Sequence, residues 1–460
     1  MEMRTEKDSL GEKQVPADAY YGIQTQRAVE NFPITGLKPF PQLVEATVLI
    51  KKAAAEANRD LGRLKPEVAE KILAAADEIL GGALRDQFVV DPIQAGAGTS
   101  HNMNTNEVLA NRASEMLGEP RGAYTIVHPN DHVNMAQSTN DVFPTAMRIA
   151  SLLALKDLYP ALNAMIAALD AKAVEFDGIV KSGRTHLQDA VPIRLGQEFG
   201  AYANAVAKAK DGIEAAAVRV KVLGIGGTAV GTGLNAGPLY PHKVVAYLNQ
   251  YTGLDLSSNA DLIHAMQDQT PVLDLSAAIR TLAVTCIRIA NDFRLLSSGP
   301  TTGLDEIRMP AVQPGSSIMP GKINPSMAEM LNQACFQVIG NDTAVMMGAQ
   351  AGQMELNVMM PGMAFAILFS IRIMTNALDV FTRFCIEGVT ANPERCLMYA
   401  HKSATVATAL NPYIGYAKAA ELVKEALKTG KTIIELAEEK DYMTREELEK
   451  VLDLRKLTEA

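Results

Sequence analysis

The sequence predicts a mainly α-helical protein built around several long helices, and three observations support this fold class. Apolar residues recur at helical spacing over long stretches, whereas the strict alternation of half-buried strands is scarce. The chain has no tryptophan and only 5% aromatic residues, which suits a helical core packed from Leu, Ile, Met and Ala. Glycine and proline gather in a few segments, which would separate the helices from one another.

The most regular helical pattern lies towards the middle of the chain. Apolar side chains recur there at alternating steps of four and three positions, at Leu275, Ile279, Leu282, Cys286, Ile289, Phe293 and Leu296. Such spacing over about three heptads is typical of the seam of a coiled coil. It predicts a long helix that packs against other helices, and it favours packing between copies of the chain.

Two more stretches predict long helices. The first places one apolar face on Leu158, Leu162, Met165, Ile166 and Leu169. The second, residues 195–222, is rich in alanine and is interrupted only by three glycines, which would let neighbouring helices approach closely. Long helices with narrow apolar faces bury little surface alone, so we expect the chain to form an oligomer.

Breaks rich in glycine or proline divide this helical background, and they lie at 96–100, 224–233 and 299–325. The chain before the first long helix is mixed in character, and the long-helix pattern gives way to shorter segments near Pro393. We therefore predict a mixed, mostly helical N-terminal domain (1–140), a central long-helix bundle (141–393) and a small helical C-terminal domain (394–460).

Composition and charge argue against several kinds of partner. The net charge is −9 and no block of basic residues occurs, so nucleic acid and anionic membranes are poor partners. No uninterrupted apolar run reaches the roughly 18 residues of a membrane span, and the charged N-terminus lacks the apolar core of a secretory signal. We therefore expect a cytoplasmic protein. The cysteines lack metal-site spacing and predict reduced, buried thiols with no metal: Cys286, Cys335, Cys385 and Cys396.

The third break contains the residues best suited to chemistry. Its segment GSSIMPGKINP, from Gly315 to Pro325, places two serines beside a glycine, with Lys322 and Asn324 shortly after them. Hydroxyls, backbone N–H groups, a cation and an amide would together bind a carboxylate. A phosphate-binding loop is excluded, because five residues instead of four separate Gly315 from the Gly-Lys pair, and Ile323 replaces the required Ser or Thr.

The second break, GIGGTAVGTG, contains a G-x-G-x-x-A pattern between Gly224 and Ala229. It follows a predicted helix instead of a strand, so it lacks the context of a dinucleotide-binding turn. We assign it no cofactor and expect a structural turn between helices.

The segment GSSIMPGKINP resembles the GSSxMPxKxNP signature of the aspartase/fumarase superfamily. Three more segments resemble the same superfamily, at 96–113, 128–150 and 182–199, and similarity extends over nearly the whole chain. The resemblance implies a mainly α, three-domain fold whose central long-helix bundle assembles into a many-helix core in a homotetramer. It also implies a small dicarboxylate substrate, active sites that are each built by three subunits, and no cofactor.

The resemblance further implies roles for individual residues. Ser316 matches the base that takes a proton from the carbon beside one carboxylate, which leaves an aci-carboxylate with two negative charges on one carboxyl group. The residues that match the substrate-binding set are Thr99, Ser138, Thr139, Asn140, Thr185, Ser317, Met319, Lys322 and Asn324. The first three, with N–H groups near Ser317, would stabilise the aci-carboxylate. Thr185, Lys322 and Asn324 would hold the other carboxylate.

His186 matches a histidine that contacts the leaving group together with Asn140. A lone histidine is more often a packed or capping residue than a catalytic one, but the surrounding Gly-Arg-Thr-His sequence matches the superfamily. Glu329 matches the acid that pairs with this histidine, and such a partner would raise the histidine pKa and fix its tautomer. His186 could protonate the leaving group or orient it, and the sequence leaves both roles open.

A separate cluster of His128, Asn130 and Asp131 resembles the second dicarboxylate site of fumarases, away from the active centre. The same Pro-Asn-Asp sequence is also ordinary turn chemistry. Both interpretations stay open, and neither involves a metal.

Two reactions share the implied base and intermediate: elimination of ammonia from L-aspartate and hydration of fumarate to malate. Segments such as GAGTSHNMNTNEV and AGQMELNVM look more like those of aspartases, whereas HPND and DVFPTAM are shared with fumarases or closer to them. Met360 departs from the acid that aspartases usually carry there. The sequence favours an aspartate ammonia-lyase, with a class II fumarate hydratase as the alternative. A non-catalytic relative is disfavoured, because the implied catalytic residues are all present.

Overall fold

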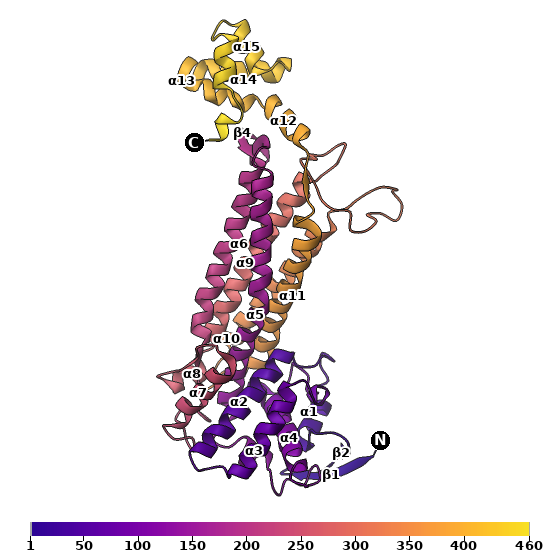
Figure 1. Ribbon diagram of the computed structural model, residues 1–460, viewed down its shortest axis with the longest axis vertical. Coiled ribbons are helices and arrows are strands. Elements are labelled where there is room, and N and C mark those ends of the chain that lie inside the picture. The colour runs from indigo at the N-terminus through magenta and orange to yellow at the C-terminus, as the bar shows by residue number, and fades with distance from the viewer. Residues whose placement is uncertain (1, 460) are drawn as a thin grey trace. The chain divides into compact units, whose positions relative to one another are not determined.

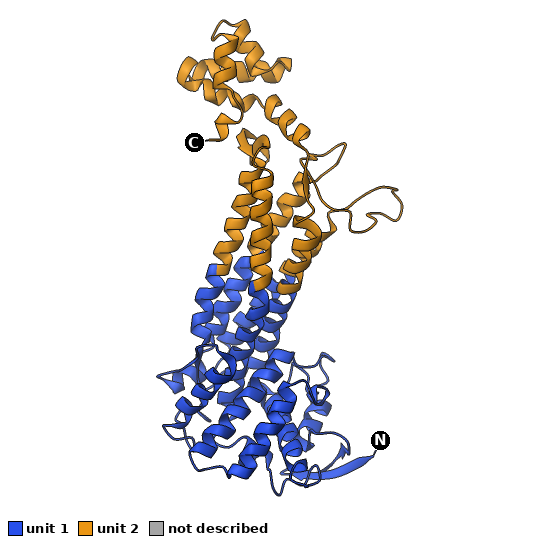
Figure 2. Ribbon diagram, viewed as in Figure 1, with its two compact units in different colours: residues 1–159, 211–283, 336–374 blue, residues 160–210, 284–335, 375–460 orange. Residues whose placement is uncertain are grey.

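The computed structural model describes residues 2–459 and confirms the mainly α fold (Figure 1). Its contacts divide the chain into two compact units (Figure 2). Unit 1 comprises the residues up to Tyr159 together with Asp211–Ala283 and Phe336–Met374. Unit 2 comprises Pro160–Lys210, Val284–Cys335 and the residues from Thr375 onward.

Long helices contribute residues to both units, and they are α5 (Thr139–Glu175), α6 (Leu195–Val220), α9 (Thr270–Leu296), α10 (Ser326–Gln350) and α11 (Met360–Phe381). Each of the three predicted long helices is confirmed within this set, as α5, α6 and α9. In α9 the side chains of the apolar seam are all buried, from Leu275 at 0% exposure to Leu296 at 6%. The helical periodicity of the sequence therefore located the central helices.

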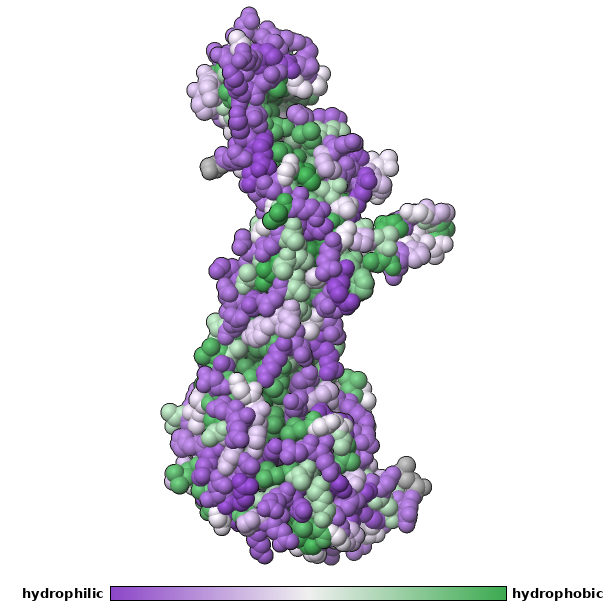
Figure 3. Space-filling view, viewed as in Figure 1, coloured by the Kyte–Doolittle hydropathy of each residue, from purple (hydrophilic) through white to green (hydrophobic). Residues whose placement is uncertain are grey.

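The interpretation of the α9 seam as a surface for self-association is wrong. The seam side chains are already buried within a single chain, so they pack against the chain's own helices. Apolar side chains that remain at the surface lie on other faces of the helices, and α10 carries Phe336, Met346 and Met347 at 57%, 46% and 53% exposure. Figure 3 shows apolar side chains at the surface of the molecule on the face in view.

In unit 1 the remaining elements form a helical body with short strands. They are β1 (Met3–Asp8), β2 (Gly11–Pro16), α1 (Ile23–Asn31), α2 (Pro41–Asp60), α3 (Pro66–Leu80), α4 (Thr99–Glu115), β5 (Val222–Leu223), α7 (Tyr240–Thr252), β6 (Ser257–Ser258) and α8 (Leu262–Gln267). Helices α2, α3 and α4 pack around a core that includes Val48, Ile72 and Leu109. Strands β1 and β2 form an antiparallel hairpin that the sequence pattern did not predict.

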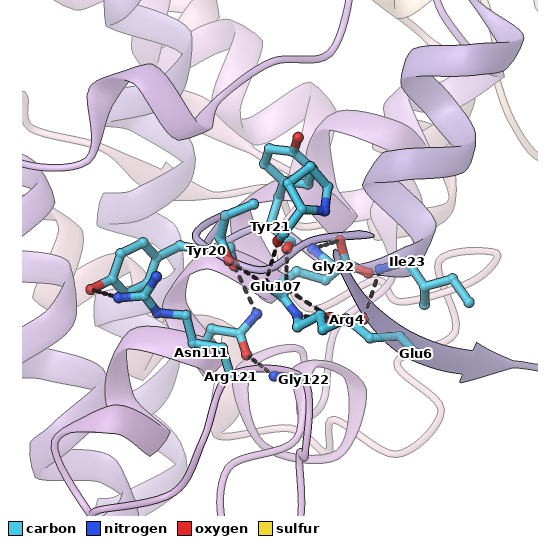
Figure 4. Close-up of polar contacts among 12 residues, drawn as sticks. Arg4, Glu6, Tyr20, Tyr21, Gly22, Ile23, Glu107, Asn111, Arg121 and Gly122 are labelled. Atoms are coloured by element: carbon cyan, nitrogen blue, oxygen red, sulfur yellow. Dashed lines mark hydrogen bonds and ion pairs between the residues drawn. The ribbon is translucent and has the colours of Figure 1, made fainter. Parts of the chain in front are cut away.

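Buried polar contacts fasten the N-terminal segment to α4 (Figure 4). The carboxylate of Glu107 on α4 accepts hydrogen bonds from the backbone N–H groups of Gly22, Gln24 and Thr25. These N–H groups lie at the start of α1, where no carbonyl of the same helix can accept them. Glu6 of β1 accepts the N–H of Ile23 in the same way. The carboxylates thus tie α1 and the N-terminal hairpin to the helix that begins at Thr99.

In unit 2 the additional elements are two short sheets and a cluster of small helices. They are β3 (Val180–Thr185), β4 (Gln188–Arg194), β7 (Ile307–Arg308), β8 (Thr390–Ala391), α12 (Pro393–Lys402), α13 (Asn411–Ile414), α14 (Tyr416–Thr429), α15 (Ile433–Glu439) and α16 (Arg445–Val451). The C-terminal helices enclose their own core, which includes Leu410, Leu422 and Leu436. The predicted division into three domains stays a prediction, because each long helix contributes residues to both units.

Two helices are apolar and long enough to cross a membrane by length and composition alone, Thr139–Glu175 and Met360–Ile386. Polar residues are scattered through both helices, so neither contains an uninterrupted apolar run of that length in the sequence. Their mean hydropathy over 18 residues is nevertheless high, at 1.4 and 1.6. In the most apolar window of each helix, 44% and 56% of the residues are buried inside the protein. Burial of this kind is what helices in the core of a bundle show.

Candidate active site

Two helix starts in unit 1 carry four of the predicted site residues. Thr99 begins α4, and Thr139 begins α5 directly after Ser138. A Cβ on Gly98 would lie 2.1 Å from the ring of Phe143, and Gly98 has a left-handed φ of +84°, so glycine lets the start of α4 approach α5 closely. The first N–H groups of both helices have no acceptor within their own helix, which makes these starts suited to binding an anion.

Side chains fix the hydroxyl and amide at the start of α5. The Asn102 amide donates a hydrogen bond of 3.0 Å to the Thr139 hydroxyl. The Asn140 amide donates to the carbonyl of Ala229 at 2.8 Å, within the glycine-rich turn at 224–233. The predicted turn is observed, but the expectation that it directly follows a helix is wrong, because strand β5 lies between α6 and Gly224. The turn contacts Asn140 and no cofactor role is assigned to it.

The buried carboxylate of Asp141 secures the same region from behind. It accepts N–H groups from Ser138, Gly226 and Thr228, each at 2.9 Å. Burial raises the pKa of Asp141 to about 6, although these backbone donors act in the opposite direction. The turn at 224–233 and the start of α5 are thus joined through one side chain.

In unit 2, Thr185 and His186 lie at the tip of an exposed hairpin. Strands β3 and β4 pair in antiparallel register with Thr185 opposite Gln188, which leaves His186 and Leu187 as a two-residue turn. Both turn residues have positive φ, 57° and 59°, a conformation that favours glycine or asparagine. A non-glycine residue in this region costs on the order of 1 kcal/mol and is typical of functional positions. The strained tip supports a functional role for His186.

The loop with the two serines closes on itself at its base. The N–H of Gly315 donates to the Lys322 carbonyl at 2.9 Å, and the Asn324 amide donates to the Gly315 carbonyl. A Cβ on residue 315 would lie 2.2 Å from the Lys322 carbonyl oxygen. Only glycine permits this approach, which explains why a glycine precedes Ser316.

Within this loop the Ser316 hydroxyl faces two backbone donors. Its Oγ accepts the N–H groups of Ile318 and Met319 at 3.2 and 3.0 Å. These backbone N–H groups would stabilise the negative charge on Oγ of a deprotonated serine. Ser317 and Met319 are exposed beside it. The loop geometry is therefore suited to a serine that acts as a base.

A cavity of about 730 Å³ in unit 2 borders the same loop. Lys322 and Asn324 line it, together with Asp305 and Arg308. Arg308 is already paired with Asp305 at 2.9 Å, whereas Lys322 is exposed. Lys322 is thus the cation of this cavity with the most freedom to meet a carboxylate.

His186 and Glu329 belong to the same unit, but they are not joined there. Among residues 2–459, no hydrogen bond or ion pair links the His186 ring to the Glu329 carboxylate. Glu329 lies in the first turn of α10. The predicted pairing of His186 with Glu329 is not formed among these residues, and it stays a prediction.

The His128 cluster forms the turn that the sequence allowed. The His128 ring accepts the N–H groups of Asn130 and Asp131 at Nδ1, both at 3.2 Å, and so caps the short helical turn Pro129–Val133. His128 and Asn130 also line a cavity of about 430 Å³ in unit 1, together with the cations Lys7 and Arg27. The turn is confirmed, and a role in dicarboxylate binding stays a prediction.

Sequence reasoning missed the polar residues that support the site from inside unit 1: Lys51, Asn102, Asn134, Gln137 and Asp141. Lys51 lies on the apolar face of α2, three positions after Val48 and four before Ala55, and all three are buried. A lysine at an apolar-face position of an amphipathic helix is unusual, and this signal could have identified Lys51 from the sequence.

The positions of the cysteines agree with the prediction of buried thiols. Cys286, Cys335, Cys385 and Cys396 are free and buried. Burial raises the pKa of Cys385 and Cys396 to about 12, which disfavours the reactive thiolate. Within the part of the chain that the structure describes, no group of three His, Cys, Asp or Glu residues could hold a metal ion.

Known proteins are similar to this chain in sequence over nearly their whole length. Residues 11–340 match the protein family described as lyase, and residues 406–459 match the fumarase C C-terminus. The aspartate ammonia-lyase of Bacillus subtilis is 50% identical over 457 residues, which cover 99% of this chain and 96% of that protein. The class II fumarate hydratase of Halobacterium salinarum is 52% identical over 451 residues, which cover 98% and 96%.

A solved structure gives the same result for the fold. The fumarate lyase:delta crystallin from Brucella melitensis, bound to cobalt, superimposes with a TM-score of 0.97 at 48% sequence identity and covers 100% of both chains. The helical fold and the serine loop thus define a lyase. The chain belongs to the aspartase/fumarase superfamily. Its full-length relatives are aspartate ammonia-lyases and class II fumarate hydratases.

Proposed function

We propose that the protein is an aspartate ammonia-lyase, which reversibly eliminates ammonia from L-aspartate to give fumarate. The closed loop in which Ser316 Oγ faces two backbone N–H groups supports proton removal next to a carboxylate, and the full-length similarity to several aspartate ammonia-lyases supports L-aspartate as the substrate. Several aspartate ammonia-lyases are about as similar as the one from Bacillus subtilis, including that of Pseudomonas aeruginosa at 48% identity. Proton removal next to a carboxylate is the step that such a loop would perform.

In the proposed reaction, deprotonated Ser316 takes a proton from C3 of L-aspartate. The electron pair of the C–H bond moves into the neighbouring carboxylate, which becomes the dianionic aci-carboxylate. Thr99, Ser138 and Thr139 would donate hydrogen bonds to this group from the two helix starts. A pre-aimed donor of this kind typically contributes about 10²–10³ in rate.

Collapse of the aci-carboxylate completes the elimination. Its electron pair forms the C2–C3 double bond, the C2–N bond breaks, and the ammonium group leaves as ammonia with the bonding pair. Thr185, Lys322 and Asn324 would hold the other carboxylate, because a cation and amide or hydroxyl donors complement its charge. Asn140 and His186 would contact the departing nitrogen, either as a proton source or as an orienting group.

We also propose that the complete site forms in a cytoplasmic homotetramer. The proposed residues come from three separate parts of the chain: the helix starts of unit 1, the hairpin tip and the serine loop. Exposed apolar side chains on α10, at Phe336, Met346 and Met347, offer a surface for self-association. Different copies of the chain would contribute the three parts to one site.

Hydration of fumarate to L-malate is the second candidate. The class II fumarate hydratase of Halobacterium salinarum is 52% identical to the chain, and the same base and intermediate would serve both reactions. Met360, at the start of α11, is fully buried and gives no physical reason to prefer either substrate.

Incubation of the purified protein with L-aspartate or L-malate separates the two reactions. We expect L-aspartate to yield fumarate, detected by ultraviolet absorbance, with one ammonia released per fumarate. We expect no comparable fumarate from L-malate. Fumarate from L-malate alone would contradict the proposal and assign the protein to hydration.

A further inference from the structure

A buried lysine lies behind the start of α5, and none of the proposed catalytic steps uses it. Lys51 on α2 has 0% exposure. Its Nζ donates to Asn134 Oδ1 and to Gln137 Oε1, both at 2.8 Å. Among residues 2–459, no carboxylate forms an ion pair with it. A buried lysine that meets only amide oxygens is unusual, since buried cations are normally paired with an anion.

Both amides that Lys51 contacts turn their oxygen atoms towards it, and their N–H groups donate to backbone carbonyls. Gln137 directs its Nε2 to the carbonyls of Val133 and Met135, both at 3.1 Å, so its oxygen must face Lys51. Asn134 likewise presents Oδ1 to Lys51, and its Nδ2 donates to the Gln137 carbonyl at 3.3 Å. Burial lowers the pKa of Lys51 to about 7. In its charged form Lys51 can only donate, so the oxygen of each amide is the end that suits it.

The same order of hydrogen-bond donors and acceptors continues on helix α4. Asn134 Oδ1 also accepts the Nδ2 groups of Asn102 and Asn106, at 3.2 and 3.3 Å. Asn102 Nδ2 in turn donates to Thr139 Oγ1 at 3.0 Å. Because this Oγ1 already accepts one hydrogen, the Thr139 hydroxyl is left to donate its own hydrogen elsewhere.

The oxygen atoms of the two α4 amides have no hydrogen-bond partner in this arrangement. Asn102 Oδ1 and Asn106 Oδ1 are buried without a hydrogen-bond partner among the described residues. An unpaired buried oxygen costs about 1–3 kcal/mol. Rotating either amide would exchange this oxygen with Nδ2, but it would then set an oxygen against Asn134 Oδ1. Both amides therefore keep their N–H groups directed at Asn134.

We propose that Lys51 is a positioning residue that acts through Asn134 and Asn102 to keep the Thr139 hydroxyl a hydrogen-bond donor towards the substrate. This inference rests on the proposed function, in which Thr139 donates to the aci-carboxylate. Without Lys51, rotation of the Asn134 amide gives up the long bond from its Nδ2 to the Gln137 carbonyl but no longer sets Nδ2 against a cation. The rotated amide would turn Nδ2 towards Asn102 and Asn106. Asn102 would then rotate as well and present its oxygen to Thr139, whose hydrogen would point inward instead of towards the substrate.

A double-mutant cycle tests whether Lys51 acts through the Thr139 hydroxyl. The variants are Lys51→Met, Thr139→Val and the double variant, with Lys52→Met as the matched control on the outer side of the same helix. We expect Lys51→Met to lower kcat/KM by about 10-fold or more, chiefly through kcat, because the lost donor serves the intermediate. In the Thr139→Val background the same change should cost less than about twofold. Lys52→Met should remain close to wild type.

An equal loss of kcat/KM in both backgrounds would overturn the proposal, since Lys51 would then act independently of Thr139. Wild-type activity within about twofold for Lys51→Met would overturn it as well. Melting temperatures of all variants separate these outcomes from unfolding.

Asn102→Asp provides a second route if Lys51→Met does not fold. The carboxylate can only accept, so it turns the Thr139 hydrogen inward while Lys51 stays in place, and we expect the same background-dependent loss. Unchanged kcat/KM in Asn102→Asp would refute the proposal. The cycle uses ratios between variants, so it gives the same answer whether wild type acts on L-aspartate or on fumarate. Failure of the proposed function therefore remains distinguishable from failure of this inference.

Discussion

His101, two positions after Thr99 on α4, is buried in a neutral state. Its Nε2 lies 2.9 Å from the Thr47 hydroxyl, which donates its own hydrogen to the Leu43 carbonyl. His101 Nε2 must therefore carry the hydrogen, and Nδ1 is buried without a hydrogen-bond partner among the described residues. Burial lowers the pKa of His101 to about 4, from an ordinary value of 6.5.

This pKa predicts a loss of stability in mild acid. Between pH 6.5 and about 4 the unfolded chain binds a proton at His101 that the folded protein does not, so the free energy of unfolding falls as the pH decreases through this window. The pKa difference corresponds to about 3 kcal/mol at its full extent. We expect His101→Gln to flatten this part of the pH–stability curve in denaturant titrations.

The exposed His401 on α12 supplies the control. His401→Gln should leave the acid limb of the curve unchanged. An acid limb as steep in His101→Gln as in wild type would show that other groups cause the loss.

Among single residues, the sequence identified those that lie in distinctive motifs, but it did not identify the buried side chains that hold them in place. Ser316 and Lys322 were found because they lie in one contiguous, unusual segment. Lys51 was not found, although its place on the apolar face of α2 is a local signal. Its acceptor Asn134 is 83 positions away, so the pair itself could not be predicted. The strain at His186 was equally hidden, since it arises only once β3 and β4 have paired.

Among the elements, the β3–β4 hairpin is held along strand β3 by ion pairs within unit 2. Arg184, next to Thr185, pairs with Glu306 at 2.9 Å, and Lys181 pairs with Glu306 at 3.1 Å and Glu198 at 2.8 Å. Glu306 has 0% exposure and directly precedes β7. One carboxylate thus connects the hairpin that bears His186 with the segment that leads into the serine loop.

Removal of the Glu306 carboxylate should lower the stability of the folded protein. Glu306→Gln leaves two buried cations with less negative charge, and breaking a buried pair of this kind typically costs about 3–5 kcal/mol. We expect a lower midpoint in thermal unfolding. Glu421→Gln, on the exposed face of α14, is the control for loss of a surface carboxylate and should change the midpoint little. Equal midpoints for the two variants would contradict the structural role of Glu306.

Periodicity predicted the long helices well, because each repeats its apolar face over many turns. It missed both hairpins, since β3 and β4 are short and their burial does not alternate. The α9 seam shows the limit of such patterns: the heptad spacing identified a helix packed against helices, but spacing alone could not distinguish neighbours in the same chain from neighbours in another copy.

For the whole molecule, assembly of each site from different copies predicts complementation between inactive variants. Thr139→Val damages the helix starts, and Ser316→Ala damages the serine loop. In mixed tetramers some sites would take an intact Thr139 from one copy and an intact Ser316 from another. Random mixing should restore about a quarter of wild-type activity if the two residues always come from different subunits.

The measurement requires unfolding the two variants together, refolding the mixture and assaying fumarate formation. Each variant refolded alone supplies the baseline. Activity of the mixture that equals the mean of the two baselines would contradict sites shared between copies.

The central claim is that Ser316 removes the C3 proton of L-aspartate, and the kcat of Ser316→Ala tests it most directly. We predict a loss of about 10²–10⁴-fold, the usual contribution of a general base, while light scattering reports an unchanged oligomer and circular dichroism an unchanged helical content. A folded Ser316→Ala variant that turns over L-aspartate at the wild-type kcat would remove Ser316 from the reaction.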